Sequence, residues 1–364
     1  MTFIRKVLII PIAVLTITAS LLSSGCNLPG LGDGPKQEGN SKQPTSNAEA
    51  QDQTKDQATD PQAELKEPVP NPLTGITVEK ANLERRPLAV MVENSPMARP
   101  QSGLAKADLI YEALAEGGIT RFMAIFYGGD AEEVGPVRSA RPYYLARAME
   151  YDALYVHSGG SPEALAQLKA PGVPHLNQFY NNTPFWRSKQ RKAPHNLYGD
   201  TLKMRKVAQQ KYPGWKGNIP VFEFLDKDQV NPDGQPAKTL TINYANKASQ
   251  VKYEYNDGEH KYYRFTAGKA HQDAVTAKQL TADNIILQFT GTKVIDGEGR
   301  RKVSMVGTGT GYLFSGGQRY RLKWAKDNLR SATRYSLAGG GKLRLNPGQT
   351  WIQVVPPGTK LNET

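Results

Sequence analysis

Cysteine is nearly absent from this 364-residue sequence, in which Cys26 is the single example. One cysteine cannot form an internal disulfide bond, so a chain of this length has to be stabilised by its apolar core. Metal sites built from cysteine pairs are excluded for the same reason, and the five histidines include no His-x-x-x-His spacing. We therefore expect neither a metal site nor a cofactor.

Two sequence patterns of common enzymes are missing or misplaced. The Gly-x-Ser-x-Gly elbow of serine hydrolases does not occur. Residues 307–311, Gly-Thr-Gly-Thr-Gly, are similar to a nucleotide-binding fingerprint, but strand-like segments surround them and no strand–turn–helix setting is present. We interpret this stretch as a turn or a bulge.

A hydrophobic run occurs at the N-terminus, but it is shorter than a membrane-spanning helix needs. Arg5 and Lys6 precede an uncharged apolar stretch at residues 7–22, whereas a spanning helix needs about 20 apolar residues. Small residues at 23–25 then lead directly to Cys26, where a signal peptide would be cleaved. This arrangement resembles the lipobox of bacterial lipoproteins. The resemblance implies a signal peptide at residues 1–25, a lipid on Cys26 and a location on the outer face of the cytoplasmic membrane.

The next segment, residues 26–71, has the composition of a disordered tether. Residues 30–70 are rich in Gln, Asp, Glu, Lys, Ser, Thr, Pro and Gly and contain no aromatic residue. Such a segment cannot bury enough apolar surface to offset the entropy lost on ordering. We expect it to separate a folded body from the membrane.

Positive charge dominates that body. The whole chain carries a formal net charge of +12, and leaving out the two cations of the signal peptide and the four excess acids of the tether gives +14 for the rest. Nucleic acid is the usual partner of a basic protein, but export argues against it, so we expect none. Lipid headgroups, anionic wall polymers and lipid-linked phosphates remain, unless the charge serves only solubility or loose adhesion.

The residues after the tether are numerous enough for two domains. We predict a mixed α/β domain at residues 72–216 and a mostly β domain at residues 217–364. In the first, apolar runs indicate strands at 87–92, 108–113, 121–127 and 154–156, with helices at 142–149 and after the capping residue Ser161. In the second, alternating patterns indicate strands at 240–244, 251–255, 261–265, 284–289 and 351–355.

Arginine is concentrated in the first predicted domain. Arg138 and Arg141 lie three residues apart at the start of a predicted helix, where backbone donors also favour anions. The planar guanidinium suits bidentate recognition of carboxylate or phosphate. We therefore predict an anion pocket formed by Asn94, Arg99, Asp108, Arg138, Arg141, His157, Arg187, Arg191, His195 and Asn196. The alternative is a set of surface cations with one buried pair.

Two histidines have their own alternatives. His157 follows a predicted strand next to Gly159 and Gly160, where catalytic groups often lie, but a lone histidine is more often structural. His271, within residues 270–273, belongs either to a hydrogen-bonded corner or to a secondary site, and the corner is favoured.

Several longer motifs resemble the YerB-like lipoproteins of Gram-positive bacteria. They are RPLAVMVEN at residues 86–94, ARPQSGL at 98–104, EGGITR at 116–121, GPVRSARP at 135–142 and APHN at 193–196, with Tyr263, Arg264, Gly268, His271 and Asp273 later in the chain. The resemblance covers nearly all of residues 72–360. It implies two consecutive domains of unknown function behind a lipoprotein signal.

The first predicted domain is also similar in motif order to the LytR-CpsA-Psr transferases. The motifs are Asp108 before a strand, VRSAR at residues 137–141, YDA at 151–153 and GGSPE at 159–163. That likeness implies that Asp108 would help to bind a metal and that Arg138 and Arg141 would bind a diphosphate. The family's Pro-Arg-Asp signature is not reproduced, because Ser139 follows Arg138. Asn94 and Arg99 stand where the family has paired Asp and Arg.

Three functions stay open at this point. The first is a lipoprotein that binds an anionic envelope polymer or a lipid-linked phosphate, with the β domain contacting an envelope protein partner. The second is an envelope transferase or hydrolase that acts on lipid-linked phosphate. The third is a structural scaffold without a ligand.

Overall fold

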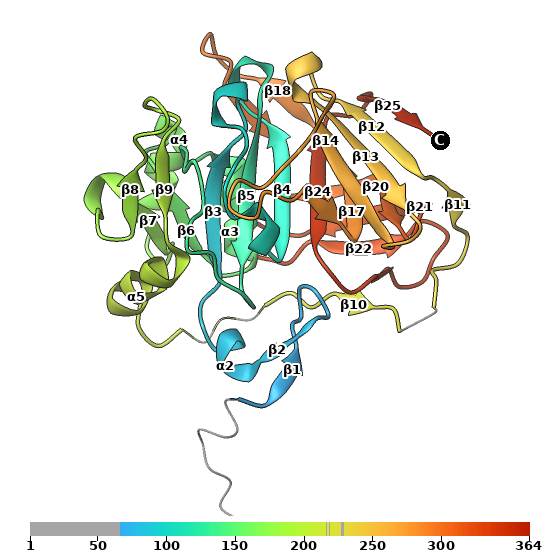
Figure 1. The fold of residues 1–364 in the computed structure, drawn as a ribbon, viewed down its shortest axis with the longest axis horizontal. Helices are drawn as coiled ribbons and strands as arrows, with labels where there is room; N and C mark the ends of the chain where they lie inside the picture. The colour runs from blue at the N-terminus through green and yellow to red at the C-terminus, as the bar shows by residue number, and fades with distance from the viewer. Residues whose placement is uncertain (1–65, 216, 218, 227–228) are drawn as a thin grey trace, which may run out of the picture. The chain divides into compact units, whose positions relative to one another are not determined.

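An 11-stranded mixed sheet forms the centre of the folded body (Figure 1). The computed structural model describes residues 66–215, 217, 219–226 and 229–364. The predicted signal peptide, Cys26 and the tether as far as residue 65 lie outside the described residues. Among the described residues, no helix is long and apolar enough to cross a membrane.

The predicted strands of the first half form one end of this sheet. Its order is β11-β21-β20-β17-β24-β4-β5-β3-β6-β7, and β22 pairs with β21. The first half contributes β3 (Leu88–Glu93), β4 (Leu109–Leu114), β5 (Thr120–Phe126), β6 (Leu154–His157) and β7 (His175–Asn177). The strands β3, β4 and β5 are buried on both faces, which explains their continuous apolar sequences.

The second half of the chain continues the same sheet. It contributes β11 (Gln235–Pro236), β17 (Asn284–Phe289), β20 (Gly307–Ser315), β21 (Gln318–Lys326), β22 (Arg334–Leu337) and β24 (Thr350–Val355). Within this sheet the two halves meet at the parallel pair of β24 and β4. The described residues from 66 onward accordingly belong to one compact unit, and the predicted boundary at residues 216 and 217 stays a prediction.

A second, six-stranded antiparallel sheet covers one face of the first. It consists of β12 (Thr239–Asn243), β13 (Gln250–Asn256), β14 (Lys261–Thr266), β15 (Lys269–Ala270), β16 (Thr281–Ala282) and β25 (Lys360–Glu363). In β12 and β13 buried and half-exposed residues alternate, as in a sheet with one face on the core. Four further strand pairs are β1 (Pro68–Pro70) with β2 (Thr77–Glu79), β8 (Phe185–Arg187) with β9 (Leu197–Gly199), β10 (Glu223–Phe224) with β23 (Arg344–Leu345), and β18 (Thr292–Val294) with β19 (Arg301–Val303).

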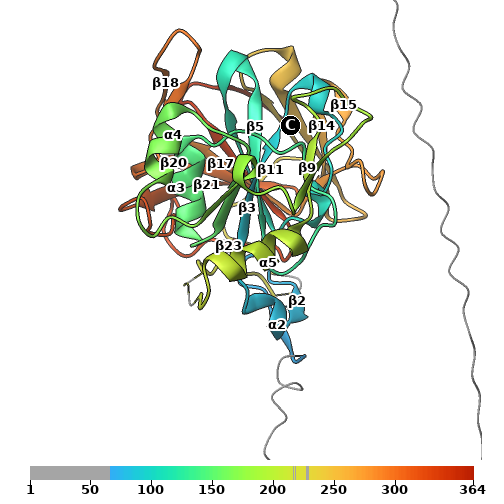
Figure 2. The same cartoon turned by 90° about the vertical axis from the view of Figure 1, so that its left-hand side faces the viewer.

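Helices cover both faces of the first half's strands (Figure 2). The helices α3 (Pro142–Glu150) and α4 (Pro162–Leu168) pack in the apolar cluster that contains Ala89 and Met91. The helix α5 (Thr201–Lys211) packs in the cluster on the other face, which also contains the inward side chains of the second sheet. The short helix α2 spans Lys80–Leu83. The predicted α/β first half and mostly β second half are confirmed.

Two predictions about local structure are wrong. The tether does not extend to residue 71, because Val69 in β1 pairs with Val78 and Asn71 is buried against Asp108, with Nδ2 and Oδ1 2.7 Å apart. Residues 307–311 are not a turn or bulge but the first part of β20, paired without interruption with β21. Glycine is needed in that strand because a Cβ on Gly311 would lie 2.1 Å from the carbonyl oxygen of Leu287.

Candidate functional site

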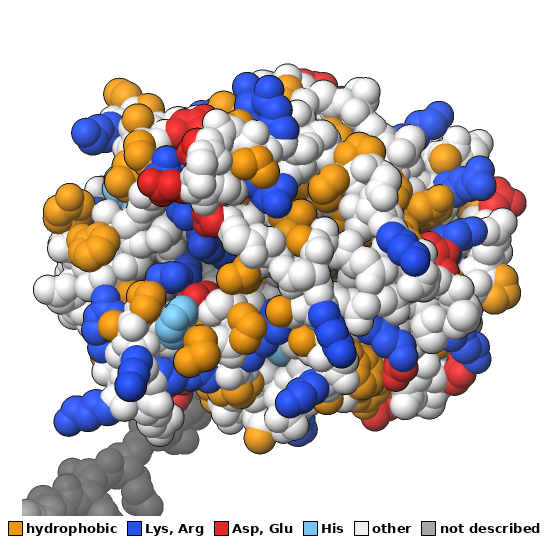
Figure 3. All heavy atoms as spheres, turned by 90° about the horizontal axis from the view of Figure 1, so that it is seen from above, with side chains coloured by type: hydrophobic (Ala, Val, Ile, Leu, Met, Phe, Trp, Pro, Cys, Tyr) orange, Lys and Arg blue, Asp and Glu red, His pale blue; other side chains and the backbone are white. Residues whose placement is uncertain are grey.

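A cavity of about 670 Å³ lies at the carboxyl ends of β6 and β7. This is the edge of an open α/β sheet where ligands commonly bind. We call it the arginine cavity, and its lining comprises Val137, Arg138, Ser139, Ser158, Gly159, Gly160, Leu165, Leu168, Lys169, His175, Asn177, Phe179, Tyr180, Arg187, Pro194 and Leu197. Three of these side chains are cationic and none is a carboxylate. Figure 3 shows a hollowed face with Lys and Arg side chains gathered in and around the hollow.

Backbone hydrogen bonds fix the segment that carries Arg138. Its amide donates to the carbonyl oxygen of Met91 in β3 at 3.0 Å, and its carbonyl accepts from the amide of Ser158, directly after β6, at 3.0 Å. The amide of Val137 donates to Leu197 in β9 at 2.6 Å. The segment is therefore joined to three neighbouring strands, which orders the floor of the cavity.

The Arg138 side chain combines an internal ion pair with free donors. Its Nε lies 3.3 Å from Oε2 of the buried Glu93. Within the described residues its two terminal nitrogens make no hydrogen bond, and the side chain is 26% exposed. Burial lowers the pKa of Arg138 and Glu93 partly opposes this effect, but an arginine stays charged in proteins. The free face of the guanidinium can therefore bind an anion.

Glu93 connects Arg138 to His195. Its Oε1 lies 2.8 Å from Nδ1 of His195 and accepts a hydrogen bond from Oγ of Ser95 at 2.7 Å. Since a carboxylate only accepts hydrogen bonds, Nδ1 of His195 carries the proton that faces Glu93. One carboxylate thus fixes a guanidinium, an imidazole and a hydroxyl.

Arg187 and Asn196 lie on the β8–β9 hairpin beside the cavity. Nη1 of Arg187 donates to Oδ1 of Asn196 at 2.9 Å, and Nδ2 of Asn196 donates to the carbonyl of Ser188 at 3.0 Å. Asn196 is buried, whereas Arg187 is exposed and lines the cavity. The amide therefore orients the arginine without neutralising its charge.

His157 lies beneath the cavity rather than in it. It is fully buried, and its Nδ1 donates to the carbonyl of Gly159 at 2.7 Å while its Nε2 lies 3.2 Å from Nδ1 of His175. Burial, aided by the proximity of His175, lowers the pKa of His157 to about 4. Burial also lowers the pKa of His175, so both imidazoles are neutral at neutral pH. This favours the structural interpretation of His157.

Arg141 and Arg191, which we predicted in the pocket, contact its surroundings instead. Arg141 forms an ion pair with Glu116 that outweighs the effect of burial and raises the arginine's pKa. Arg191 donates from Nη2 to the carbonyl of Pro100 at 2.6 Å and from Nη1 to that of Ala98. Both arginines therefore stabilise loops around the arginine cavity.

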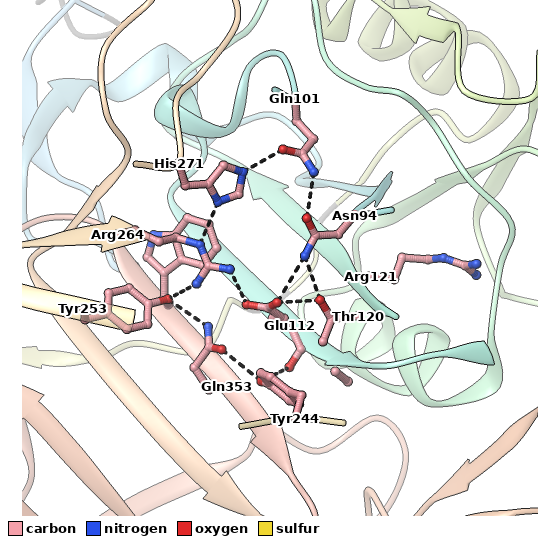
Figure 4. A network of polar contacts seen from close by, with 12 residues as sticks. Asn94, Gln101, Glu112, Thr120, Arg121, Tyr244, Tyr253, Arg264, His271 and Gln353 are labelled. Atoms are coloured by element: carbon pink, nitrogen blue, oxygen red, sulfur yellow. Dashed lines mark hydrogen bonds and ion pairs between the residues drawn. The ribbon is translucent and has the colours of Figure 1, made fainter. Parts of the chain in front are cut away.

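Asn94 belongs to a separate polar network that is buried between the two sheets (Figure 4). It donates from Nδ2 to Oγ1 of Thr120 at 2.7 Å. The half-buried Arg99 donates from Nε to Oδ1 of Asn94 at 2.9 Å. Oγ1 of Thr120 donates in turn to Oε1 of Glu112 at 2.6 Å. Asn94, Thr120 and Glu112 are too deeply enclosed to meet a ligand without opening the sheets, whereas Arg99 is only partly buried.

The centre of that network is an ion pair between the two halves of the chain. Glu112 in β4 and Arg264 in β14 are fully buried and 2.8 Å apart. Arg264 also donates from Nε to Nδ1 of His271 at 3.0 Å, and its guanidinium lies 4.3 Å from the ring centre of Trp351. His271 donates from Nε2 to Gln101 at 2.7 Å. Its pKa is far below the ordinary value because of burial and the charge of Arg264, and the predicted hydrogen-bonded corner is confirmed.

Asp108 lies at the opposite end of the sheet from the arginines. It precedes β4, and its Oδ2 accepts from the amide of Tyr127 at 2.6 Å, whereas Glu93 and Arg121 pair at the other end of β3 and β5. Asp108 is buried, and burial raises its pKa. No group of three acidic, histidine or cysteine side chains in the described ranges could hold a metal ion. The likeness to the LytR-CpsA-Psr transferases implied that Asp108, Arg138 and Arg141 bind one ligand. Their positions at opposite ends of the sheet do not fit that arrangement.

Sequence reasoning missed several residues of the site. Glu93 is the last residue of an otherwise apolar strand. A carboxylate at such a position was the sequence signal that could have identified Glu93 as a site residue. Lys169 follows α4 and His175 begins β7. No local sequence pattern predicts that these two residues lie near Arg138. Phe179 and Tyr180 line the cavity and are 63% and 82% exposed, and aromatic exposure is not visible in a sequence.

A larger cavity of about 840 Å³ lies along β20, β21 and β22. Its lining contains three cations, Lys323, Arg334 and Lys342, together with the carboxylate of Glu223. Arg334 pairs with Asp327 at 2.6 Å and Lys342 pairs with Glu223 at 2.7 Å. Because two of the three cations already have carboxylate partners and a carboxylate lines the cavity, the arginine cavity is the better candidate for an anion.

Comparisons with known proteins agree with the motifs in the sequence. Residues 73–216 match the family described as "Protein of unknown function (DUF3048) N-terminal domain", and residues 240–352 match its C-terminal domain. The sequence is 37% identical to "Putative lipoprotein YerB" of Bacillus subtilis (strain 168), over 84% of this chain and 90% of that protein. The crystal structure of YerB from Bacillus subtilis matches with a TM-score of 0.72 and 35% identity, over 81% of this chain and 99% of that chain.

Proposed function

The chain belongs to the DUF3048 family of two-domain proteins, and from this premise we propose that it binds a phosphate- or carboxylate-bearing ligand of the cell envelope in the arginine cavity. The observation that carries the proposal is the free guanidinium face of Arg138 in the arginine cavity. Arg187 and Lys169 also line this cavity, and no carboxylate lines it. Guanidinium–phosphate and guanidinium–carboxylate contacts are among the stronger hydrogen bonds in proteins.

The location of the protein forms part of the proposal. The leader and Cys26 would place a lipid-anchored protein on the outer face of the cytoplasmic membrane, and the relative in Bacillus subtilis carries the word lipoprotein in its name. There the body, with its excess of positive charge, would meet anionic wall polymers and lipid-linked phosphates rather than nucleic acid. The mostly β second half would be free to contact an envelope protein.

The rim of the cavity indicates a further property of the expected ligand. Phe179 and Tyr180 are exposed aromatic side chains on the same cavity as the arginines. Exposed apolar surface that borders polar groups is typical of a binding site. A polymer of alternating phosphates and polyols or sugars would place charge on the arginines and carbon–hydrogen groups on the rings.

The test is equilibrium binding of the full-length protein in detergent to poly(glycerol phosphate). Arg138→Ala combined with Arg187→Ala should weaken binding about 100-fold, because two charge-assisted hydrogen-bonding groups are lost. The matched control is Lys238→Ala combined with Lys252→Ala, which removes the same charge from exposed positions of the second sheet. Equal losses in both double variants would show that net charge alone attracts the polymer and would contradict the proposal.

A further inference from the structure

We propose that His195 is a general acid–base catalyst oriented by Glu93 and that the arginine cavity hydrolyses the phosphodiesters it binds. This inference rests on the proposed function, because the substrate has to be held by Arg138 and Arg187. It adds a reaction to what would otherwise be a binding site, and it assigns separate roles to the carboxylate and the imidazole.

The hydrogen bonds around His195 define a single tautomer. Oε1 of Glu93 lies 2.8 Å from Nδ1, so this nitrogen is the donor, and in the neutral imidazole Nε2 carries the lone pair. Among the described residues, Nε2 of His195 has no hydrogen-bond partner. An imidazole with one nitrogen fixed by a buried carboxylate and the other free is the arrangement of a general base and its orienting group.

The position of the pair relative to the cavity supports a catalytic use. Glu93 contacts both His195 and Arg138, and Arg138 lines the cavity. Pro194, which precedes His195, and Leu197, two residues after it, line the same cavity. The His195 side chain is 24% exposed. Because Glu93 contacts both side chains, we infer that a phosphate on Arg138 would lie close to the imidazole.

The burial of Glu93 also explains why it orients rather than reacts. Its side chain is 5% exposed, and Ser95, His195 and Arg138 surround its carboxylate. A water molecule at the cavity can reach the exposed imidazole but not the enclosed oxygens. Glu93 is accordingly a positioning residue, and His195 is the group that touches the reacting atoms.

The reaction needs no oxidant or second substrate other than water. Nε2 of His195 takes a proton from water while the water oxygen forms a bond to phosphorus, and Arg138 and Arg187 stabilise the negative charge on the phosphoryl oxygens. The bond between phosphorus and the leaving oxygen then breaks, and the imidazolium returns the proton to that oxygen. The products are a phosphomonoester and an alcohol.

The experiment measures 4-nitrophenol release from bis(4-nitrophenyl) phosphate and phosphomonoester formation from poly(glycerol phosphate), with the full-length protein. We expect turnover by the wild type and a fall in kcat of about 10²- to 10⁴-fold in His195→Asn with little change in KM, as for loss of a general base. Asparagine retains a donor for Glu93 but lacks the second nitrogen. Added imidazole should restore part of the rate of His195→Gly, and the control His260→Asn, at an exposed turn of the second sheet, should react like the wild type.

The outcomes separate the two proposals. Absence of turnover by the wild type on both probes, an unchanged kcat in His195→Asn, or failure of imidazole to rescue His195→Gly would overturn the acid–base role of His195. Polymer binding by the wild type that is lost in the Arg138 and Arg187 double variant would leave the binding function standing in each of those cases. Melting temperatures of all variants within about 2 °C of the wild type show that the comparison concerns folded protein.

Discussion

At the scale of single residues, buried imidazoles are the groups whose charge the fold changes most. His157 and His271 are enclosed, and burial keeps both neutral in the folded protein. His157 is bonded through one nitrogen to a backbone carbonyl and through the other to His175. Protonation would therefore place a charge in an apolar region and break one of these bonds.

This predicts how stability depends on pH. The pKa of His157 is about 4 in the folded protein, compared with 6.5 for an ordinary histidine. Between these pH values the unfolded chain binds more protons, so the free energy of unfolding falls as the pH decreases from 6.5 to 4, by about 3 kcal/mol for this group. Urea denaturation across this range should give a shallower pH dependence for His157→Phe than for the wild type or His260→Asn. Identical slopes in all three proteins would contradict the assignment.

Residue by residue, the sequence supported some members of the site better than others. Arg138, Arg187, His195 and Asn196 are close in space because the segment after residue 135 and the β8–β9 hairpin both contact the end of β3. Asn94 and Arg99 were predicted with them, but Asn94 is buried with Glu112 and Arg99 is hydrogen-bonded to Asn94. Their separation could not be predicted, because whether a polar side chain faces a cavity or the interior depends on which sheet covers it.

At the scale of secondary structure elements, burial explains both the successes and the failures of the sequence predictions. Buried strands have continuous apolar sequences and strands of the covering sheet alternate, so their positions could be predicted. The strand order could not be, because β24 and β4 are neighbours in the sheet although more than 200 residues separate them in the chain. The glycine-rich start of β20 was misinterpreted because glycine usually weakens a strand.

The glycines of β20 give a testable consequence. A Cβ on Gly311 would lie 2.1 Å from the carbonyl oxygen of Leu287 and 2.8 Å from Leu322. Gly311→Ala should therefore push β20 away from β17 and lower the free energy of unfolding by more than about 2 kcal/mol. Gly297→Ala, in a loop with nothing within 4 Å of the added atom, should change it by less than about 0.5 kcal/mol. Chemical denaturation distinguishes these results, and equal stability of both variants would contradict the described packing.

At the scale of the whole folded body, the two halves of the chain are joined by shared strands and by buried charges. The parallel pair of β4 and β24 makes the large sheet continuous. The ion pair of Glu112 with Arg264 links β4 to the covering sheet, and Lys326 of β21 pairs at 2.8 Å with Glu150 of α3. Loss of one partner of a buried pair leaves an uncompensated charge, so the two halves are expected to unfold together.

The same organisation places the arginine cavity on a rigid support. Its walls come from segments that follow β6, precede α3 and connect β8 to β9, all of them joined to the central sheet by backbone hydrogen bonds. A site supported in this way loses little freedom when a ligand binds. The molecule is therefore suited to selecting an anionic ligand from among the polymers of the envelope.

The central claim is that the arginine cavity is occupied by an anionic envelope ligand in the cell, and mass spectrometry of the protein purified from native membranes tests it most directly. We expect a phosphate- or uronate-bearing molecule to accompany the wild type and the Lys238 and Lys252 double variant, and to be missing from the Arg138 and Arg187 double variant. Recovery of the same molecule from all three proteins, or of none but neutral lipids from the wild type, would contradict it.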